Sequence, residues 1–337
     1  MWPMKIDIML EPDLNPEQIS ALAQLAESYG LRALWVQNYV ASRDPFMCLV
    51  PAALATKKIL LGVVVVSPYE MHPMKIGNAL FTLNEFCTGR AAVVVGGGGY
   101  WCGRMGIRAE RMVRAIRESI EIIKGASPEA PLRYQGELYN AYGYHPDWAT
   151  DTPPRVYAGA SREQMLRMSA RVADGVMMSD VTRQSIGQAV DTVNGALKDN
   201  NRPESGFSIS NGLAFHIKKD RQTAIREARR ELLIRGLLDE WYLRTFLSEA
   251  DFRIVESKMA SFYKAYRNRT HEIEDVPETI LDALVDNLTF SGNLDDLEDK
   301  LAELEVFKAA GLTELVFRLH DDPADAVRII GQRIAVS

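Results

Sequence analysis

Small residues that leave the backbone accessible follow two of the strands that the sequence predicts. Four consecutive glycines come after the apolar run 91–95, and they are Gly96, Gly97, Gly98 and Gly99. Because glycine has no Cβ, a ligand can approach the backbone of such a turn closely. A second turn, made of Gly159, Ala160 and Ser161, follows the apolar segment 155–158. We interpret the glycine run as a candidate ligand contact.

Three polar residues at the ends of two other predicted strands carry groups that could hold or move a proton. Glu11 follows the strand 4–10, and a carboxyl group at that place can act as a general acid. The alternative is a solvated loop carboxylate. Asn38 and Tyr39 follow the strand 33–36 and can hydrogen-bond to a ring edge or a substrate. Ordinary loop polarity is the alternative for this pair.

The remaining reactive side chains have structural interpretations. His72 precedes Pro73 at the start of a predicted helix, so capping is favoured over catalysis. The three cysteines, Cys48, Cys87 and Cys102, are scattered and lack metal-ligand spacing. We therefore expect reduced thiols, no metal site and a cytoplasmic protein.

Alternating strands and helices must position these groups. The predicted strands are 4–10, 33–36, 59–66, 91–95, 155–158, 174–178, 207–217 and 314–319, with helical periodicity between them. The β-branched run 59–66 suits a strand that is buried on both faces of a parallel sheet. Eight such repeats predict an α/β fold, a (β/α)8 barrel, in which chemistry gathers at the carboxyl ends of the strands.

A doubly wound open sheet is the alternative fold, but no strand–GxGxxG–helix unit opens the chain. We expect one domain over residues 1–337, with two insertions. Residues 125–154 are rich in Pro, Gly and Tyr and are predicted to pass over the barrel mouth. Residues 221–290 are mostly helical, and 221–269 are too long and too charged for one crossover.

Composition excludes several classes of partner. The chain has 337 residues, of which 47% are apolar, and a net charge of −6 with both signs dispersed. This charge balance argues against nucleic acid or an anionic membrane surface as the main partner. No apolar run is as long as a membrane span, and the N-terminal residues lack the pattern of a signal peptide. A small-molecule substrate is the remaining expectation.

A set of short motifs resembles the bacterial-luciferase-like flavin and deazaflavin oxidoreductases. Within them it is most similar to the coenzyme F420-dependent branch, close to the methylenetetrahydromethanopterin reductases. The motifs are Trp35-Val36, Arg43-Asp44, Ile59-x-x-Gly62, Pro68-Tyr69-x-x-His72-Pro73, Thr82-Leu83-x-Glu85, Gly89-Arg90, the glycine run, Pro154 to Ala160 and Ala173 to Val176. The resemblance extends from residue 4 to about residue 179.

The resemblance implies a cofactor site. Family members carry a non-proline cis peptide and a bulge in the third strand, under the middle ring of the flavin or deazaflavin; here this is Val64-Val65. It also implies that the glycine turn 96–99 follows the ribityl chain. The turn 159–161 would hold the phosphate at a helix N-terminus. Relatives often form homodimers through helices beside strands two to four, so a homodimer is expected.

The chain departs from the family pattern at three places. Deazaflavin relatives often have Asp-His where this chain has Asn38-Tyr39, and the reductases have acids where it has Met9 and Tyr100. Glu11, two positions beyond Met9, is the best remaining acid. We therefore expect Asn38 and Tyr39 to orient and polarise the substrate rather than to relay protons.

Three functions remain open at this point. The first is hydride transfer between coenzyme F420 and a small organic substrate. The second is an FMN-dependent, luciferase-like monooxygenase with the same fold. The third is a non-catalytic relative that binds a flavin-like ligand or a partner.

Overall fold

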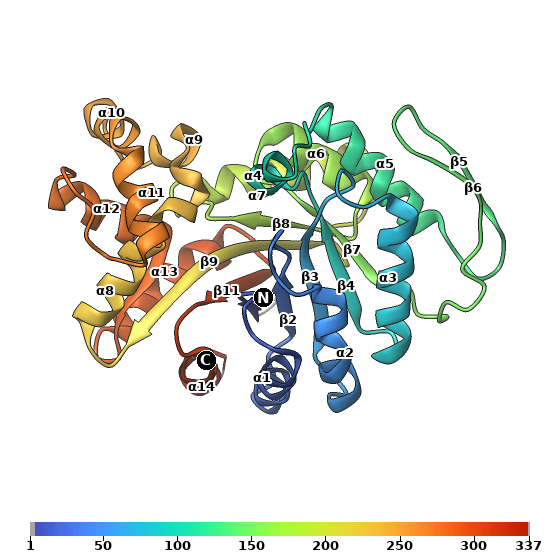
Figure 1. Cartoon of the computed structure of the whole chain (residues 1–337), viewed down its shortest axis with the longest axis horizontal. Coiled ribbons are helices and arrows are strands. Elements are labelled where there is room, and N and C mark those ends of the chain that lie inside the picture. The colour runs from blue at the N-terminus through green and yellow to red at the C-terminus, as the bar shows by residue number, and fades with distance from the viewer. Residues whose placement is uncertain (1–3, 336–337) are drawn as a thin grey trace.

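A closed barrel of eight parallel strands forms the centre of the computed structural model, which describes residues 4–335 except for the side chains of residues 99–101 (Figure 1). Pairing of β8 with β9 closes the barrel. The predicted (β/α)8 fold is therefore confirmed. In barrel order the strands are β1 (Lys5–Leu10), β2 (Ala33–Gln37), β3 (Leu60–Val66), β4 (Ala91–Val95), β7 (Arg155–Gly159), β8 (Gly175–Ser179), β9 (Ser208–Lys218) and β11 (Glu314–Leu319).

Helices cover the outside of the barrel and bury their apolar faces against the strands. They are α1 (Pro16–Ser28), α2 (Pro45–Ala55), α3 (Pro73–Phe86), α5 (Met112–Gly125), α6 (Glu163–Val172), α7 (Ile186–Asp199), α13 (Leu297–Ala309) and α14 (Pro323–Arg333). A short further helix, α4 (Gly99–Arg104), follows the carboxyl end of β4. Local chemistry sets where several begin: Asn15 forms a capping box, and Asp44 caps α2 ahead of a proline. Nδ1 of His72 accepts the Met74 N–H at 3.3 Å, which confirms the capping role predicted for His72.

Alternate residues of each strand point into the barrel, because side chains in a strand alternate between its two faces. The middle of the interior is an apolar cluster that includes Met9, Trp35, Val94, Met177 and Val316. The Trp35 side chain fills the centre of the barrel, because the β3 residue that faces it, Gly62, has no side chain. A Cβ on Gly62 would lie 2.1 Å from Cε3 of Trp35.

A buried ionic cluster fills the amino-terminal end of the barrel. Nε of Arg32 donates to Oδ1 of Asp7 at 2.8 Å, and its Nη2 pairs with Oε2 of Glu314 at 2.8 Å. The hydroxyls of Ser208 and Ser210 each donate to Glu314 at 2.6 Å. Burial raises the pKa of Asp7 to about 6, while the charge of Arg32 opposes that rise. Arg32 is thus the cation that holds two buried carboxyl groups in the barrel floor.

The first insertion contains a two-stranded antiparallel hairpin that the sequence did not predict, β5 (Leu132–Gln135) and β6 (Asn140–Tyr144). It projects beside α3 and α5 (Figure 1). The Tyr144 hydroxyl donates to Asn78 of α3 at 3.0 Å, and the Tyr134 hydroxyl donates to Glu121 of α5 at 2.5 Å. At the hairpin tip the Tyr139 hydroxyl donates to the Pro68 carbonyl, after β3. The predicted path over the mouth is therefore correct only for this tip.

The second insertion is a helical unit with its own apolar cluster. It comprises α8 (Arg221–Arg230), η1 (Leu232–Ile234), η2 (Gly236–Leu238), α9 (Glu240–Leu243), α10 (Glu249–Ser257), α11 (Met259–Asn268) and α12 (Glu278–Leu288). A further strand, β10 (Thr289–Asn293), pairs in parallel with β9 and was not predicted. Figure 1 shows this unit at the end of the molecule opposite the hairpin. The interpretation as one domain with two insertions stays a prediction.

Arg32→Met is expected to lower the free energy of unfolding by about 3–5 kcal/mol, because it leaves the carboxyl groups of Asp7 and Glu314 buried without their cation. Urea unfolding followed by circular dichroism measures the change. Arg167→Met is the matched control, since Arg167 pairs with Glu163 at the surface, and it should change stability little. Equal effects of the two substitutions would contradict the assignment of Arg32 as the organising cation.

Candidate active site

The carboxyl ends of β3, β4 and β7 meet around small residues. A Cβ built on Gly159 would lie 3.7 Å from the Gly96 Cα and 3.7 Å from Cγ2 of Val65. Gly98 has a φ of +72°, which favours glycine, and a Cβ there would lie 2.5 Å from the Cys102 sulfur. The two turns of small residues predicted from the sequence are thus neighbours in space. We call the backbone surface formed by residues 64–65, 96–99 and 159–161 the small-residue cradle.

The peptide bond between Val64 and Val65 is cis, as expected, and the β3–β4 register shifts between Val64 and Val66. Asn38 supports this irregular strand. Its backbone N–H donates to the Val64 carbonyl at 2.8 Å, and its Nδ2 donates to the Val65 carbonyl at 3.2 Å and to Oε1 of Glu70 at 2.7 Å. The structure therefore places Asn38 against the cradle rather than beside Glu11.

The turn 159–161 leads directly into α6, so the N-terminus of this helix lies beside the cradle. The first backbone N–H groups of a helix have no partner within the helix. Arg162, the N-cap residue, makes no side-chain cap hydrogen bond. Ser161 Oγ accepts a hydrogen bond from the Ser179 N–H at 3.4 Å. A helix N-terminus without a side-chain cap offers donors and a positive dipole end to an anion. The chemistry of this turn suits a phosphate group.

Glu11 and Tyr39 lie on the opposite side of the mouth, joined by Gln37. Nε2 of Gln37 donates to Oε1 of Glu11 at 2.8 Å, and the Tyr39 hydroxyl donates to Oε1 of Gln37 at 2.9 Å. The same carboxyl oxygen of Glu11 is 3.4 Å from Nδ1 of His320. We call these four residues the acid group. Glu11 is not a freely solvated loop carboxylate, since its side chain is 21% exposed.

Burial sets the protonation of the acid group. It raises the pKa of Glu11, while the guanidinium groups of Arg318 and Arg235 oppose that rise. It lowers the pKa of His320 well below its usual range, with the neighbouring His216 and the two arginines adding to the effect. Burial, followed by the charge of Glu11, raises the pKa of Tyr39 well above its usual range. Near neutral pH, His320 is uncharged and Tyr39 is a hydrogen-bond donor rather than a base.

The second insertion covers this side of the mouth. The His216 ring stacks on His320 with centroids 5.1 Å apart, and its Nδ1 is 3.0 Å from Glu227 of α8. Arg235, fully buried between η1 and η2, is 3.5 Å from Asp180 after β8. Within the described part of the chain, five nitrogens here have no hydrogen-bond partner: Arg235 Nε and Nη2, Arg318 Nε, His216 Nε2 and His320 Nε2. The three arginine nitrogens are donors, and the two imidazole nitrogens donate or accept according to the tautomer, so the set suits polar atoms of a bound molecule.

A pocket of about 270 Å³ opens between the loops after β2 and β3. Its wall includes Asn38, Tyr39, Glu70 and Met71. Asn38 and Tyr39, which the sequence predicted as a pair, therefore line the same cavity. Their side chains have different hydrogen-bond partners, Val65 for Asn38 and Gln37 for Tyr39. In the part of the chain that the structure describes, no group of three or more His, Cys, Asp or Glu side chains is arranged to hold a metal ion. No helix in that part is long and apolar enough to cross a membrane.

Sequence reasoning missed Gln37, His320, Arg318 and Arg235. For three of them a signal existed. Gln37 lies two residues beyond the inward Trp35, and Arg318 and His320 lie two and four residues beyond the inward Val316. The period of two in a strand places all three at the mouth. Arg235 offered no such signal, because it reaches the mouth from the insertion.

The barrel and the residues at its mouth can now be compared with known protein families. Residues 2–312 match the model of the family described as luciferase-like monooxygenase, so the chain belongs to that family. This confirms the resemblance found in the motifs.

Individual relatives are similar over almost the whole chain. The 5,10-methylenetetrahydromethanopterin reductase of Archaeoglobus fulgidus is 26% identical over 337 residues, covering 98% of each protein. The solved coenzyme F420-dependent tetrahydromethanopterin reductase from Methanopyrus kandleri has a TM-score of 0.82 at 22% identity, covering 98% of both chains. An F420-dependent secondary alcohol dehydrogenase, solved with an F420–acetone adduct, has a TM-score of 0.78 at 15% identity, with 99% of both chains covered.

Proposed function

We propose that the protein is an oxidoreductase that transfers a hydride between coenzyme F420 and a small organic substrate. The observation that carries the proposal is the division of the mouth into a small-residue cradle and an acid group. Relatives whose names specify F420 or a methanopterin reductase, matched over nearly their whole length, support the choice of cofactor. The deazaflavin supplies the hydride chemistry when it is bound.

The cradle fits this cofactor because it is made of backbone. Val64, Val65 and the glycines 96–99 would lie along the ring system and ribityl chain, and the turn 159–161 would hold the phosphate. A Cβ on Gly159 would enter this space, since its nearest neighbours are Val65, Gly96 and, at 3.3 Å, Val94 Cγ1. The glycine at this position keeps the space open.

The acid group supplies or accepts the proton that accompanies hydride transfer. Glu11 holds a proton at its carboxyl oxygen more readily than an exposed glutamate does, because burial raises its pKa. Gln37 and His320 fix the orientation of the carboxyl group. Tyr39 donates its single hydroxyl hydrogen to Gln37, so it holds Gln37 in place and presents its hydroxyl oxygen to the substrate. Asn38 positions the Val64–Val65 segment and lines the pocket. The covering insertion excludes water from this side.

The parent protein is expected to bind F420 in preference to FMN, and Gly159→Ala should weaken F420 binding by at least about tenfold, or 1.4 kcal/mol. The added methyl group fills the cradle, and its 3.3 Å approach to Val94 Cγ1 requires that side chain to shift by a few tenths of an ångström. Thermal unfolding of the variant checks that the fold is kept. Fluorescence titration with each cofactor gives the affinities. Gly195→Ala, on α7 with nothing within 4 Å, is the control and should bind F420 normally.

Binding of FMN without F420 would reject the proposed cofactor and favour the monooxygenase alternative. Unchanged F420 affinity in Gly159→Ala would show that the cofactor does not use the cradle.

Glu11→Gln should lower turnover by roughly a hundredfold or more, the usual size of a lost general acid. Glu11 acts in its protonated form, so the parent's turnover should fall as pH rises through the raised pKa of Glu11. This fall in turnover with rising pH should be absent from the pH profile of Glu11→Gln. Tyr39→Phe removes one donor to Gln37 and should affect KM more than kcat. Steady-state kinetics from pH 5 to 9 test this.

A Glu11→Gln variant with parental turnover and an unchanged pH profile would show that the proton comes from another group. F420 binding without turnover of any alcohol, aldehyde or imine tested would favour the non-catalytic alternative.

The outer face of α2 supports a homodimer. Met47 and Leu54 are each 70% exposed, and Val50 and Pro51 between them are partly exposed. These four residues form one apolar stripe at helical spacing, which is unusual for a helix facing water. We also place the enzyme in the cytoplasm, since its three cysteines are free and buried.

The double variant Met47→Glu/Leu54→Glu is expected to be monomeric, because it puts two charges into the stripe, while the parent is a dimer by multi-angle light scattering. Val306→Glu changes a single exposed apolar residue on α13 and should stay dimeric. A parent mass equal to one chain would rule out the dimer.

A further inference from the structure

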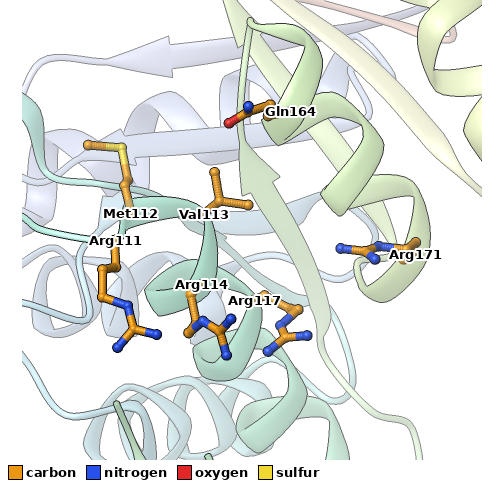
Figure 2. A pocket seen from close by; sticks show the side chains of 7 residues that line it. All are labelled: Arg111, Met112, Val113, Arg114, Arg117, Gln164 and Arg171. Atoms are coloured by element: carbon orange, nitrogen blue, oxygen red, sulfur yellow. The ribbon is translucent and has the colours of Figure 1, made fainter. Parts of the chain in front are cut away.

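A second, larger pocket lies outside the barrel mouth, between α5 and α6. Its volume is about 470 Å³, and its wall consists of Arg111, Met112, Val113, Arg114, Arg117, Gln164 and Arg171. Figure 2 shows Arg111, the N-cap residue of α5, next to Arg114 and Arg117 of that helix. Arg171 extends from α6 toward them (Figure 2). We call this pocket the arginine groove. Four guanidinium groups and no acidic side chain line it, although the whole chain has a net charge of −6.

Nearby carboxylates neutralise the groove only in part. Arg111 and Arg114 share a single partner, Glu137. Arg117 is 3.9 Å from Glu118 and 4.0 Å from Glu121, distances at the limit of an ion pair.

The carboxylate of Glu118 is already occupied by three backbone N–H groups, of residues 137, 138 and 139. Within the described residues, no ion pair of Arg171 is found. The groove therefore has a positive charge that is available to an anionic ligand.

The groove begins at the cradle. Met112, in its wall, is so close to the glycine turn that a Cβ on Gly97 would lie 2.6 Å from its sulfur. Gln164 belongs to the first turn of α6, directly after the turn 159–161. From Gln164 to Arg171 the groove follows α6 for about 10 Å, at 1.5 Å per residue. A chain leaving a phosphate at the start of α6 can enter the groove without crossing another element.

The ligand must then be a flexible chain that carries several negative charges and continues from a phosphate. Coenzyme F420 has such a chain, since its phosphodiester is followed by an oligoglutamate tail with one carboxylate per residue. FMN ends at its phosphate. We propose that the arginine groove binds the oligoglutamate tail of F420, an inference that rests on the proposed cofactor. Arginine suits this role because its planar guanidinium group can bind a carboxylate through two parallel hydrogen bonds.

Binding of F420 forms that differ only in tail length tests the proposal. The probes are F420 without glutamates and F420 with five or six, titrated by fluorescence into the full-length protein at about 50 mM salt. The parent should bind the long-tailed form about five- to tenfold more tightly, the effect of a few partly exposed ion pairs. This preference should decline at about 500 mM salt, because the charges are near the surface.

Arg117→Gln/Arg171→Gln removes two positive charges and leaves the Glu137 pairs intact. It should bind both forms with the affinity that the parent has for the tail-less form. Arg117→Lys/Arg171→Lys keeps the charge and should retain most of the preference. Arg226→Gln/Arg267→Gln, on α8 and α11, should behave as the parent. Thermal unfolding of each variant checks that the fold is intact.

Equal affinity of the parent for both forms would overturn the groove proposal and leave the proposed cofactor standing. A tail preference that survives in Arg117→Gln/Arg171→Gln would also overturn it, because the tail would then bind elsewhere. Failure of both forms to bind would overturn the proposed function, and the groove proposal with it.

Discussion

Eight parallel strands close into one barrel, and this closure limits what every other part of the molecule can be. The pairing of β8 with β9 leaves no free edge between them, so every second residue of the eight strands must fit inside one cylinder. The interior therefore has layers, and each layer has its own chemistry. Asp7 and Glu314 occupy the floor, Met9 and Trp35 the apolar middle, and Glu11 the mouth.

The apolar middle layer separates the ionic cluster in the floor of the barrel from the polar residues at its mouth. Trp35 occupies the axis opposite Gly62 and donates its indole N–H to Asp7 at 3.0 Å, so it seals the ionic floor from the site above. Above this seal, β7 ends in Gly159 and β4 leads into Gly96. By contrast, β2 ends in Gln37 and β1 leads into Glu11. The same strand period thus produces an open backbone surface on one side and an acid on the other.

Sequence periodicity was sufficient for the barrel because strand and helix patterns are local. All eight barrel strands were predicted within a few residues, as were the cis bond at Val64–Val65 from the family resemblance and the cap at His72. The hairpin β5–β6 was missed because its exposed strands lack a continuous apolar face. The strand β10 was missed because it is short and contains Ser291, Gly292 and Asn293.

The site was predicted only in part, because local patterns locate the ends of strands but not the contacts between distant segments. Residues at strand ends were found, but their partners depend on contacts between distant segments. Asn38 and Tyr39 are adjacent in sequence, yet one bonds to Val65 and the other to Gln37. Arg235 reaches the mouth from an insertion whose path no local pattern specifies. The arginine groove joins two helices about 50 residues apart, which periodicity cannot bring together.

The proposed function requires the barrel mouth to divide into a backbone cradle for the cofactor and an acid group that faces it. A crystal structure of the protein with F420 bound tests this most directly. We expect the phosphate at the turn 159–161, the ring system against Val64 and Val65, and Glu11 on the open side of the ring. A ring system bound on the side of β1 and β2, with the turn 159–161 free of phosphate, would contradict it.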